Sequence, residues 1–154
     1  MGQVIRPARA DEARALHALA ELAYAPWEAT VGRRPEPMEE DYAARIRAGQ
    51  VWVLDEGGIA ALAVLEPGDG WVMLENVAVH PERQREGLGR QMIAFAAAEA
   101  RRRGAHELRL FANALMAANL ARYAHLGFRE TSRERVGAYD RIHMTLDLAA
   151  SRDL

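Results

Sequence analysis

The sequence predicts one α/β domain that spans residues 1–154. Three observations lead to this fold class. The length of 154 residues suits a single hydrophobic core. Segments with helical periodicity alternate along the chain with segments of strand character. No internal repeat, linker or low-complexity tract divides the chain. The expected order is β-α-α-β-β-β-α-β-α-β-β.

The first third of the chain predicts a strand and two helices. A short strand is expected over Gln3–Ala8, followed by a helix over Asp11–Tyr24 with its first residue as the N-cap. Residues 25–38 are rich in proline and glycine and predict a loop. Pro37 suits the first turn of a second helix, which ends at Gly49.

Three strands are expected in the middle of the chain. Val51–Asp55 and Ile59–Leu65 flank Gly57-Gly58, which is a hairpin signal. Trp71–His80 forms the third strand. Its interior is nearly continuous in apolar residues, which predicts burial on both faces.

The last third of the chain alternates between helices and strands. A helix is expected over Leu88–Arg103 and a second one over Met116–Leu126, each stopped by the glycine that follows. Leu108–Ala112 is a strand between them. Phe128–Val136 and Tyr139–Leu148 form the final pair of strands.

Composition excludes several classes of function. A net charge of -2 provides no basic surface for nucleic acid, so we expect no nucleic-acid partner. The absence of cysteine excludes disulfides, thiolate metal sites and a cysteine nucleophile. The histidines lack metal-ligand spacing, so no metal is expected. No segment has the pattern of a signal peptide or the length of a membrane span, which predicts a cytoplasmic protein without a membrane partner.

The point where the third strand meets the long helix predicts a phosphate site. The segment Gln84-Arg85-Glu86-Gly87-Leu88-Gly89 has a Q-x-x-G-x-G pattern at the start of a helix, where free backbone N–H groups attract anions. Arg83, Arg85 and Arg90 add positive charge. The chain has no lysine for a Walker loop, and Met92 replaces the third glycine of a dinucleotide fingerprint.

Two motifs resemble those of the GCN5-related N-acetyltransferases, the GNAT family. The strand Glu75-Asn76-Val77-Ala78-Val79-His80-Pro81 and the glycine turn after it are similar to the family's motif A. The segment 119–128, in which Tyr123 precedes Gly127-Phe128, is similar to its motif B. The resemblance covers essentially the whole chain. It implies a central, mixed, mostly antiparallel sheet of six to seven strands, flanked by four helices.

The resemblance implies acetyl-CoA as the acyl donor. Its pantetheine arm is expected along the strand Val77–Val79, and its pyrophosphate on the backbone of the glycine turn. A strand N–H near Val77 or Ala78 is the expected donor to the oxyanion. The expected cofactor-binding residues are Val77, Ala78, Val79, Gln84, Arg85, Glu86, Gly87, Leu88, Gly89, Arg90, Asn119 and Tyr123.

Two residues are the expected catalytic groups. Glu75 is the candidate general base, because its place on the strand matches a glutamate of the family and burial would raise its pKa. The alternative is a structural partner for an arginine or a backbone group. Tyr123 is the candidate acid, and the alternative is simple packing against the pantetheine arm. Asn76 is expected on the opposite face of the strand from Glu75.

The sequence departs from the family pattern at two positions. The usual asparagine seven residues before the tyrosine is here Met116, so Asn119 is the expected substitute in preference to Asn113. Glu86 occupies a turn position that more often holds arginine or glycine. Its charge is expected to weaken pyrophosphate binding unless an arginine pairs with it.

The acceptor side is expected in the first two helices and their loop. Tyr24, Trp27 and Met38, with Glu75, are the candidate substrate residues, and they suit an apolar or cationic amine. The alternative is that Trp27 and Met38 fill the core beneath the loop. Arg33 and Arg34 either hold a carboxylate of the acceptor or are solvated.

Three functions are compatible with these residues. The first is transfer of acetyl to the primary amine of a small molecule. The second is acetylation of a protein N-terminus or a lysine. The third is a domain that binds acetyl-CoA without turnover. A homodimer is permitted by an apolar last strand from Arg141 to Leu148.

Overall fold

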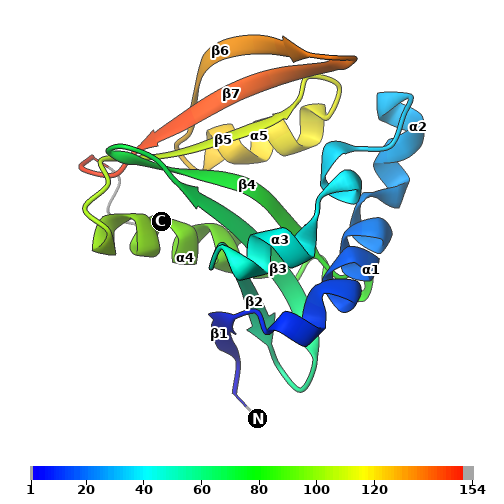
Figure 1. Cartoon of the computed structure of the whole chain (residues 1–154). Helices are drawn as coiled ribbons and strands as arrows, with labels where there is room; N and C mark the ends of the chain where they lie inside the picture. Colours follow the sequence, from blue (N-terminus) through cyan, green and yellow to red (C-terminus); the bar gives the residue numbers. More distant parts are fainter. Residues whose placement is uncertain (1, 151–154) are drawn as a thin grey trace.

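A computed structural model describes residues 2–150 of the chain. Its seven strands form one sheet in the order β1-β2-β3-β4-β5-β7-β6. β1 and the β6–β7 hairpin occupy opposite edges, at the bottom and the top of Figure 1. The strands are β1 Val4–Pro7, β2 Val51–Asp55, β3 Ile59–Pro67, β4 Trp71–Val79, β5 Glu107–Asn113, β6 Arg129–Val136 and β7 Tyr139–Asp147. Only β4 and β5 pair in parallel, so the expected mixed, mostly antiparallel sheet is confirmed.

The four expected helices are present, and a fifth, single-turn helix accompanies them. They are α1 Ala13–Tyr24, α2 Glu28–Val31, α3 Tyr42–Arg47, α4 Leu88–Arg102 and α5 Ala117–His125. One core cluster joins the sheet to α4 and α5, and a second joins it to α1 and α3. None of the helices within residues 2–150 has the length and apolar character that a membrane crossing requires.

The N-terminal helices differ from the sequence expectation at their starts. Asp11 lies inside a 3₁₀ turn, Ala10–Glu12, and does not cap α1; the Glu12 carboxylate instead accepts from the N–H of Arg9 at 2.7 Å. The expected loop 25–38 contains 3₁₀ turns and α2.

The second expected helix is divided in two. Pro37 belongs to a 3₁₀ turn over Glu36–Glu39, and α3 begins only at Tyr42. The reason is local, because Glu40 is extended and the Asp41 carboxylate caps α3 by accepting from the N–H of Ala44 at 3.1 Å.

β7 lies inside the sheet, between β5 and β6. Its apolar side chains Ile142, Met144 and Leu146 are buried in the chain's own core. This strand therefore offers no apolar surface to a second copy, and the homodimer stays a prediction without that support.

Candidate active site

β4 carries an irregularity at the residue expected to act as the base. Asn76 pairs with Val64 on β3, but Leu74 pairs with Leu65, so Glu75 is an extra residue without a counterpart. A bulge of this kind reverses the alternation of side chains and bends the strand. Bulges recur next to active sites, where they redirect a side chain.

The bulge places two consecutive side chains toward α3. A carboxylate oxygen of Glu75 lies 3.9 Å from the Arg45 guanidinium. The side-chain amide of Asn76 donates to the Tyr42 hydroxyl at 2.8 Å. The expectation that Asn76 lies on the face opposite Glu75 is therefore wrong, because strict alternation fails at a bulge.

β4 and β5 separate after the bulge. Their pairing runs only from Trp71 with Glu107 to Leu74 with Leu110. The second half of β4 therefore has β3 on one side and an open edge on the other. Val72 and Leu74 are buried in the core cluster with α4 and Ala78 in the cluster with α1 and α3, so β4 contributes buried residues to both faces, as expected. From Glu75 onward its half-buried residues line cavities.

The open edge exposes the backbone of two residues. His80 donates its N–H to Ala60 on β3 at 2.9 Å, and antiparallel alternation then directs the backbone groups of Val79 and Val77 away from β3. The same alternation directs the N–H of Ala78 toward β3. Of the two expected oxyanion donors, Val77 therefore has the suitable orientation.

Side chains form hydrogen bonds with the carbonyl oxygens of this edge. Its N–H groups face the opening. The Tyr24 hydroxyl lies 2.8 Å from the carbonyl oxygen of Val77 and 2.8 Å from Oδ1 of Asn76. The side-chain amide of Gln84 donates to the carbonyl oxygen of Val79 at 3.3 Å. Gln84 thus joins the glycine turn to the end of β4.

A cavity of about 520 Å³ extends from this edge to the glycine turn. Eleven of the twelve expected cofactor-binding residues line it, and Glu86 does not. Its lining residues are Ala23, Tyr24, Trp27, Val77, Ala78, Val79, Gln84, Arg85, Gly87, Leu88, Gly89, Arg90, Ile93, Asn119, Arg122, Tyr123, His125 and Leu126. The shape and the backbone donors suit a long, flexible ligand with an anionic group at the turn.

The glycine turn has the conformation of an anion site. Arg85 and Gly87 have φ of 74° and 80°, and Gly87 is the N-cap of α4. Alternation of left- and right-handed residues makes successive N–H groups converge, and the helix dipole adds positive potential there. A left-handed arginine is uncommon, which is typical of backbone held for a functional purpose.

Of the arginines around the turn, one forms ion pairs within the protein and two line the cavity. Arg83 pairs with Glu86 at 2.9 Å and with Glu56 at 2.8 Å. Glu86 was expected to weaken pyrophosphate binding unless an arginine pairs with it, and Arg83 is that arginine. Arg85 and Arg90 line the cavity, where they are placed to contact an anion.

α5 forms the opposite wall of the cavity. Asn119 and Tyr123 both line it, as expected for one helical face. Asn113 instead uses its side-chain oxygen to accept from the N–H of Leu115 at 2.9 Å, which supports the choice of Asn119. Arg122 and His125 also line the cavity and were missed by sequence reasoning, although their helical spacing from Asn119 and Tyr123 could have indicated them.

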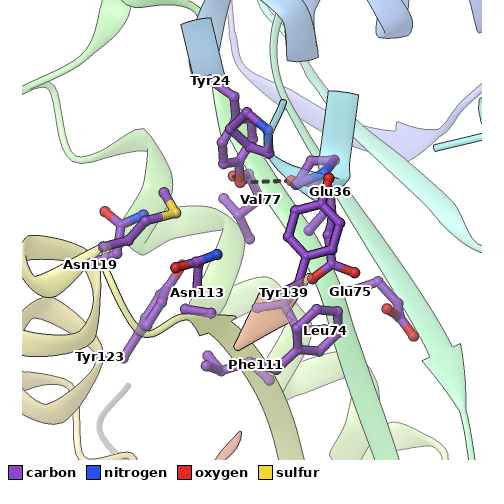
Figure 2. Close-up of a pocket in the computed structure, with 16 residues that line it drawn as sticks. Tyr24, Glu36, Leu74, Glu75, Val77, Phe111, Asn113, Asn119, Tyr123 and Tyr139 are labelled. Carbon is purple, nitrogen blue, oxygen red and sulfur yellow. Dashed lines mark hydrogen bonds between the residues drawn. The ribbon is translucent and has the colours of Figure 1, made fainter. Parts of the chain in front are cut away.

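A second cavity of about 50 Å³ adjoins the first (Figure 2). Four residues line both cavities, namely Tyr24, Val77, Asn119 and Tyr123. Glu75 lines only the smaller one. In Figure 2, Glu75 and Tyr123 come from opposite sides of the space, from β4 and α5 respectively. Two titratable groups thus line the smaller cavity, and one of them, Tyr123, also lines the larger one.

Their protonation states differ in the way that acid–base chemistry requires. Burial, together with a hydrogen bond to Glu66, raises the pKa of Glu75 to about 7, against the attraction of Arg45. Burial also raises the pKa of the Tyr123 hydroxyl, which therefore keeps its proton at neutral pH. Within residues 2–150 that hydroxyl has no hydrogen-bond partner. Glu75 can accept a proton near neutral pH, and Tyr123 can donate one.

Contacts between distant segments form the outer side of the smaller cavity. The Tyr139 hydroxyl donates to the carbonyl oxygen of Arg34 at 2.5 Å, and Arg141 pairs with Glu36 at 2.5 Å. The Arg34 side chain forms ion pairs with Glu21 and Glu39, so its guanidinium already has carboxylate partners within the protein. These contacts hold the segment before α3 against β7.

The expected substrate residues occupy three different environments. Tyr24 lines both cavities, and Trp27 lines the larger one only. Met38 is 2% exposed and lines neither, which corresponds to the alternative that it fills the core. Sequence reasoning missed Glu36, Phe111 and Tyr139 on the acceptor side, because no local pattern connects them.

Comparison with known proteins is consistent with this geometry. A family model described as an acetyltransferase (GNAT) domain matches residues 47–130, which is more than half of the chain. The ribosomal protein bS18-alanine N-acetyltransferase of Escherichia coli K12 is 38% identical over 79 residues, which are 51% of this chain and 53% of that protein. The match thus spans about half of the length of that relative.

Solved structures share the fold over nearly the whole chain. The ribosomal-protein-S18-alanine N-acetyltransferase from Escherichia coli has a TM-score of 0.72 at 25% identity, covering 99% of this chain and 97% of that one. The PaiA N-acetyltransferase from Thermoplasma acidophilum, solved in complex with coenzyme A, has a TM-score of 0.76 at 16% identity, covering 96% and 99%. At that identity the second likeness concerns the fold alone.

Proposed function

Since the chain belongs to the GNAT acetyltransferase family, we propose that it transfers an acetyl group from acetyl-CoA directly to a primary amine. One observation carries the proposal. Glu75 and Tyr123 both line the small cavity, and Val77 directs a backbone N–H toward the open edge of β4 at the junction with the large cavity. Acetyl-CoA bound in the larger cavity supplies a thioester at this junction.

The residues present fit acetyl-CoA. The N–H groups of Val77 and Val79 can pair with the amides of a pantetheine arm, and Asn119 faces the same space. The turn from Gln84 to Arg90 can hold a pyrophosphate through backbone N–H groups, which makes the side chain of Glu86 dispensable. Arg122 and His125 extend the polar wall.

Three groups of the chain divide the chemistry. Glu75 takes a proton from the acceptor ammonium, which leaves a nucleophilic amine. The N–H of Val77 donates to the acyl oxygen as negative charge develops on it. The Tyr123 hydroxyl donates a proton to the departing sulfur. Direct transfer needs no acyl-enzyme, which agrees with a chain that lacks cysteine.

The first candidate acceptor is a compact primary amine of a small molecule. The smaller cavity is only about 50 Å³, and its outer side is held by the contacts of Tyr139 and Glu36. The carboxylates and aromatic rings around it suit a cation. An amine on an unbranched carbon fits this space better than a bulky one.

The second candidate acceptor is a protein N-terminus. The similarity to an enzyme named for acetylating the alanine of ribosomal protein bS18 favours it. A small terminal residue could enter the cavity while the rest of the protein lies outside. A cytoplasmic location and a single domain over residues 1–154 remain part of the proposal for either acceptor.

The test is a thermal-shift titration with acetyl-CoA, run beside a thiol-release assay. The amines are short alkyl amines, aryl-ethyl amines, a peptide with N-terminal alanine, and an N-acetylated peptide whose only amine is a lysine. Acetyl-CoA should raise the melting temperature. Release with small amines supports the first acceptor, and release with the alanine peptide alone supports the second. No thermal shift would overturn the proposal.

A further inference from the structure

Three carboxylates surround one guanidinium beside the candidate base. Arg45 on α3 lies 2.9 Å from Glu40, 3.6 Å from Glu66 and 3.9 Å from Glu75. Three negative charges around one positive charge are unfavourable in a partly buried site, so one carboxyl of the group is expected to keep a proton at neutral pH. The proposed chemistry uses Glu75 and assigns nothing to the other two.

Glu75 and Glu66 are neighbouring carboxyl groups, one at the cavity and one nearer the surface. Glu66 lies on β3, the strand paired with β4, and its carboxylate shares the Arg45 guanidinium with that of Glu75. The Glu75 side chain is 16% exposed and the Glu66 side chain is 45% exposed. Glu75 lines the smaller cavity, whereas Glu66 lines neither cavity. The carboxylate beside Glu75 is therefore the more exposed of the two and lies outside the cavity.

The proposed reaction produces a proton that needs a path to solvent. Conversion of an ammonium to an amide breaks two N–H bonds. One proton ends on the sulfur of the released thiol, and the other must leave the enzyme. Each turnover thus exports one proton from the cavity, and Glu75 must lose the proton it accepted before it can act again.

We propose that Glu66 is a positioning residue that shares the proton of Glu75 and passes it to solvent, with Arg45 holding the two carboxyls together. This inference rests on the proposed function. In each cycle the ammonium N–H bond breaks and an O–H bond forms at Glu75. That O–H bond then breaks as one forms at Glu66, and the last proton transfer is to water.

The charges on every side of Glu75 agree with this arrangement. Burial is the largest influence on the pKa of Glu75 and raises it; Glu66 raises it further, and Arg45 lowers it. Glu40 beside α3 also raises it, and Arg141 on β7, which is paired with Glu36, interacts with Glu75 electrostatically. The hydrogen bond from Glu75 lowers the pKa of Glu66. Opposite directions at two bonded carboxyls are typical of one shared proton.

The decisive experiment measures the titration of Glu75 by carbon-13 NMR of side-chain carboxyls in the ligand-free protein. The Glu75 signal is assigned by its absence in Glu75→Gln. Glu66→Gln should lower the midpoint of Glu75 by about one pH unit, because a neutral amide that donates to a carboxylate replaces a repelling carboxyl. Arg45→Gln should raise it by a similar amount, because the cation that lowers the pKa of Glu75 is lost.

Controls separate this arrangement from a general change of charge. Glu130→Gln removes an exposed carboxyl on β6 and should leave the midpoint of Glu75 unchanged. Glu66→Asp keeps the charge and should restore most of the wild-type midpoint. Glu66 is partly exposed, so its variants should fold even if Arg45→Gln does not. Unchanged midpoints in Glu66→Gln would overturn the proposal.

Thiol release against pH then tests proton export. With the panel amine that reacts fastest, the acid limb of kcat/KM should move down in Glu66→Gln together with the NMR midpoint, and kcat should fall about tenfold because the exit group is lost. An unchanged kcat would overturn the export role. A wild-type protein that binds acetyl-CoA but releases no thiol from any amine would instead overturn the proposed function, whatever the NMR midpoints.

Discussion

The two cavities that meet at Tyr123 are built in opposite ways. The larger one takes most of its lining from two short stretches, residues 77–93 and 119–126, and offers backbone N–H groups and arginines. The smaller one is assembled from segments spread between Tyr24 and Tyr139, and its polar groups are mainly side chains. Under the proposed function, recognition of the donor by backbone groups depends on conformation, whereas recognition of the acceptor depends on side-chain identity.

This difference has a consequence for mutation. Changes in the smaller cavity should alter chemistry and acceptor choice without altering acetyl-CoA binding. Changes in the larger cavity should act through backbone conformation and charge, and so on acetyl-CoA affinity. The variants below test whether the two cavities are separable in this sense.

The largest effect is expected for Glu75→Gln. Loss of the base should lower kcat about 10²- to 10³-fold, because proton transfer contributes that much in such reactions. Acetyl-CoA affinity, measured by calorimetry, should stay within about twofold. Glu130→Gln, on the exposed strand β6, is the matched control and should retain full activity. A parallel loss of acetyl-CoA binding in Glu75→Gln would show that the cavities are not separable.

The same variant should change the pH dependence of stability. The folded pKa of Glu75, about 7, lies above its ordinary value of 4.5, so its favourable contribution is complete below pH 4.5 and is lost as pH rises through 7. Glu75→Gln removes this loss. The free energy of unfolding of the variant, relative to wild type, should therefore be roughly 2 kcal/mol higher at pH 8 than at pH 4.5, as measured by urea unfolding. If the free energies of unfolding of variant and wild type differ by the same amount at pH 4.5 and pH 8, the raised pKa of Glu75 is contradicted.

A smaller loss is expected for Tyr123→Phe, at the junction of the cavities. The rate should fall about 10- to 100-fold through loss of a proton donor. Stability should change by less than about 0.5 kcal/mol, because the hydroxyl has no partner within residues 2–150. Tyr139→Phe is the contrast, since its hydroxyl donates to Arg34 and its loss should raise the KM of the amine. If Tyr123→Phe keeps the wild-type rate, packing is the residue's only role.

Gly87→Ala should weaken acetyl-CoA binding about tenfold, because at a φ of 80° a Cβ costs about 1–2 kcal/mol and displaces the turn. Gly104→Ala, beyond the other end of α4, has a φ of 79° and equally open surroundings. Both variants should lose similar stability in thermal unfolding. Only Gly87→Ala should lose affinity. Equal affinities would exclude a role for the turn in binding.

The smallest effect is expected for Arg90→Gln. Loss of one cation beside an anionic ligand should reduce acetyl-CoA affinity about two- to fivefold at low salt, and less at high salt because ions screen the attraction. Arg135→Gln makes the same change of net charge on the exposed strand β6. It should leave affinity and its salt dependence unchanged. A salt-independent loss in Arg90→Gln would point to packing instead of charge.

Sequence reasoning predicted the elements around the larger cavity well for a physical reason. The glycine turn, β4 and α5 each owe their form to local signals, namely a helix start, an apolar strand and a tyrosine at fixed helical spacing. The same signals indicated the seven strands and four main helices. The predictions were wrong at the ends of helices and at irregular positions. Asp11 was predicted to cap α1, and one continuous helix was predicted from Pro37.

The acceptor side could not be predicted in this way. Met38 seemed as suitable as Tyr24 for a substrate site, yet it is buried in the core. Phe111 and Tyr139 have no local feature that marks them, and they line the cavity because β5 and β7 pair beside the open edge of β4. Side chains far apart in sequence meet only through the order of strands.

The sequence by itself determined the family, the position of the glycine turn and the choice of Glu75 and Tyr123 as candidate catalytic residues, because these depend on residue type and short spacing. The tertiary structure alone decided the environment of Glu75. The bulge on β4, the register with β3 and the packing of α3 bring Glu66 and Arg45 beside it. Burial and neighbouring charge set the proton affinity of a carboxyl, and both are properties of the folded chain.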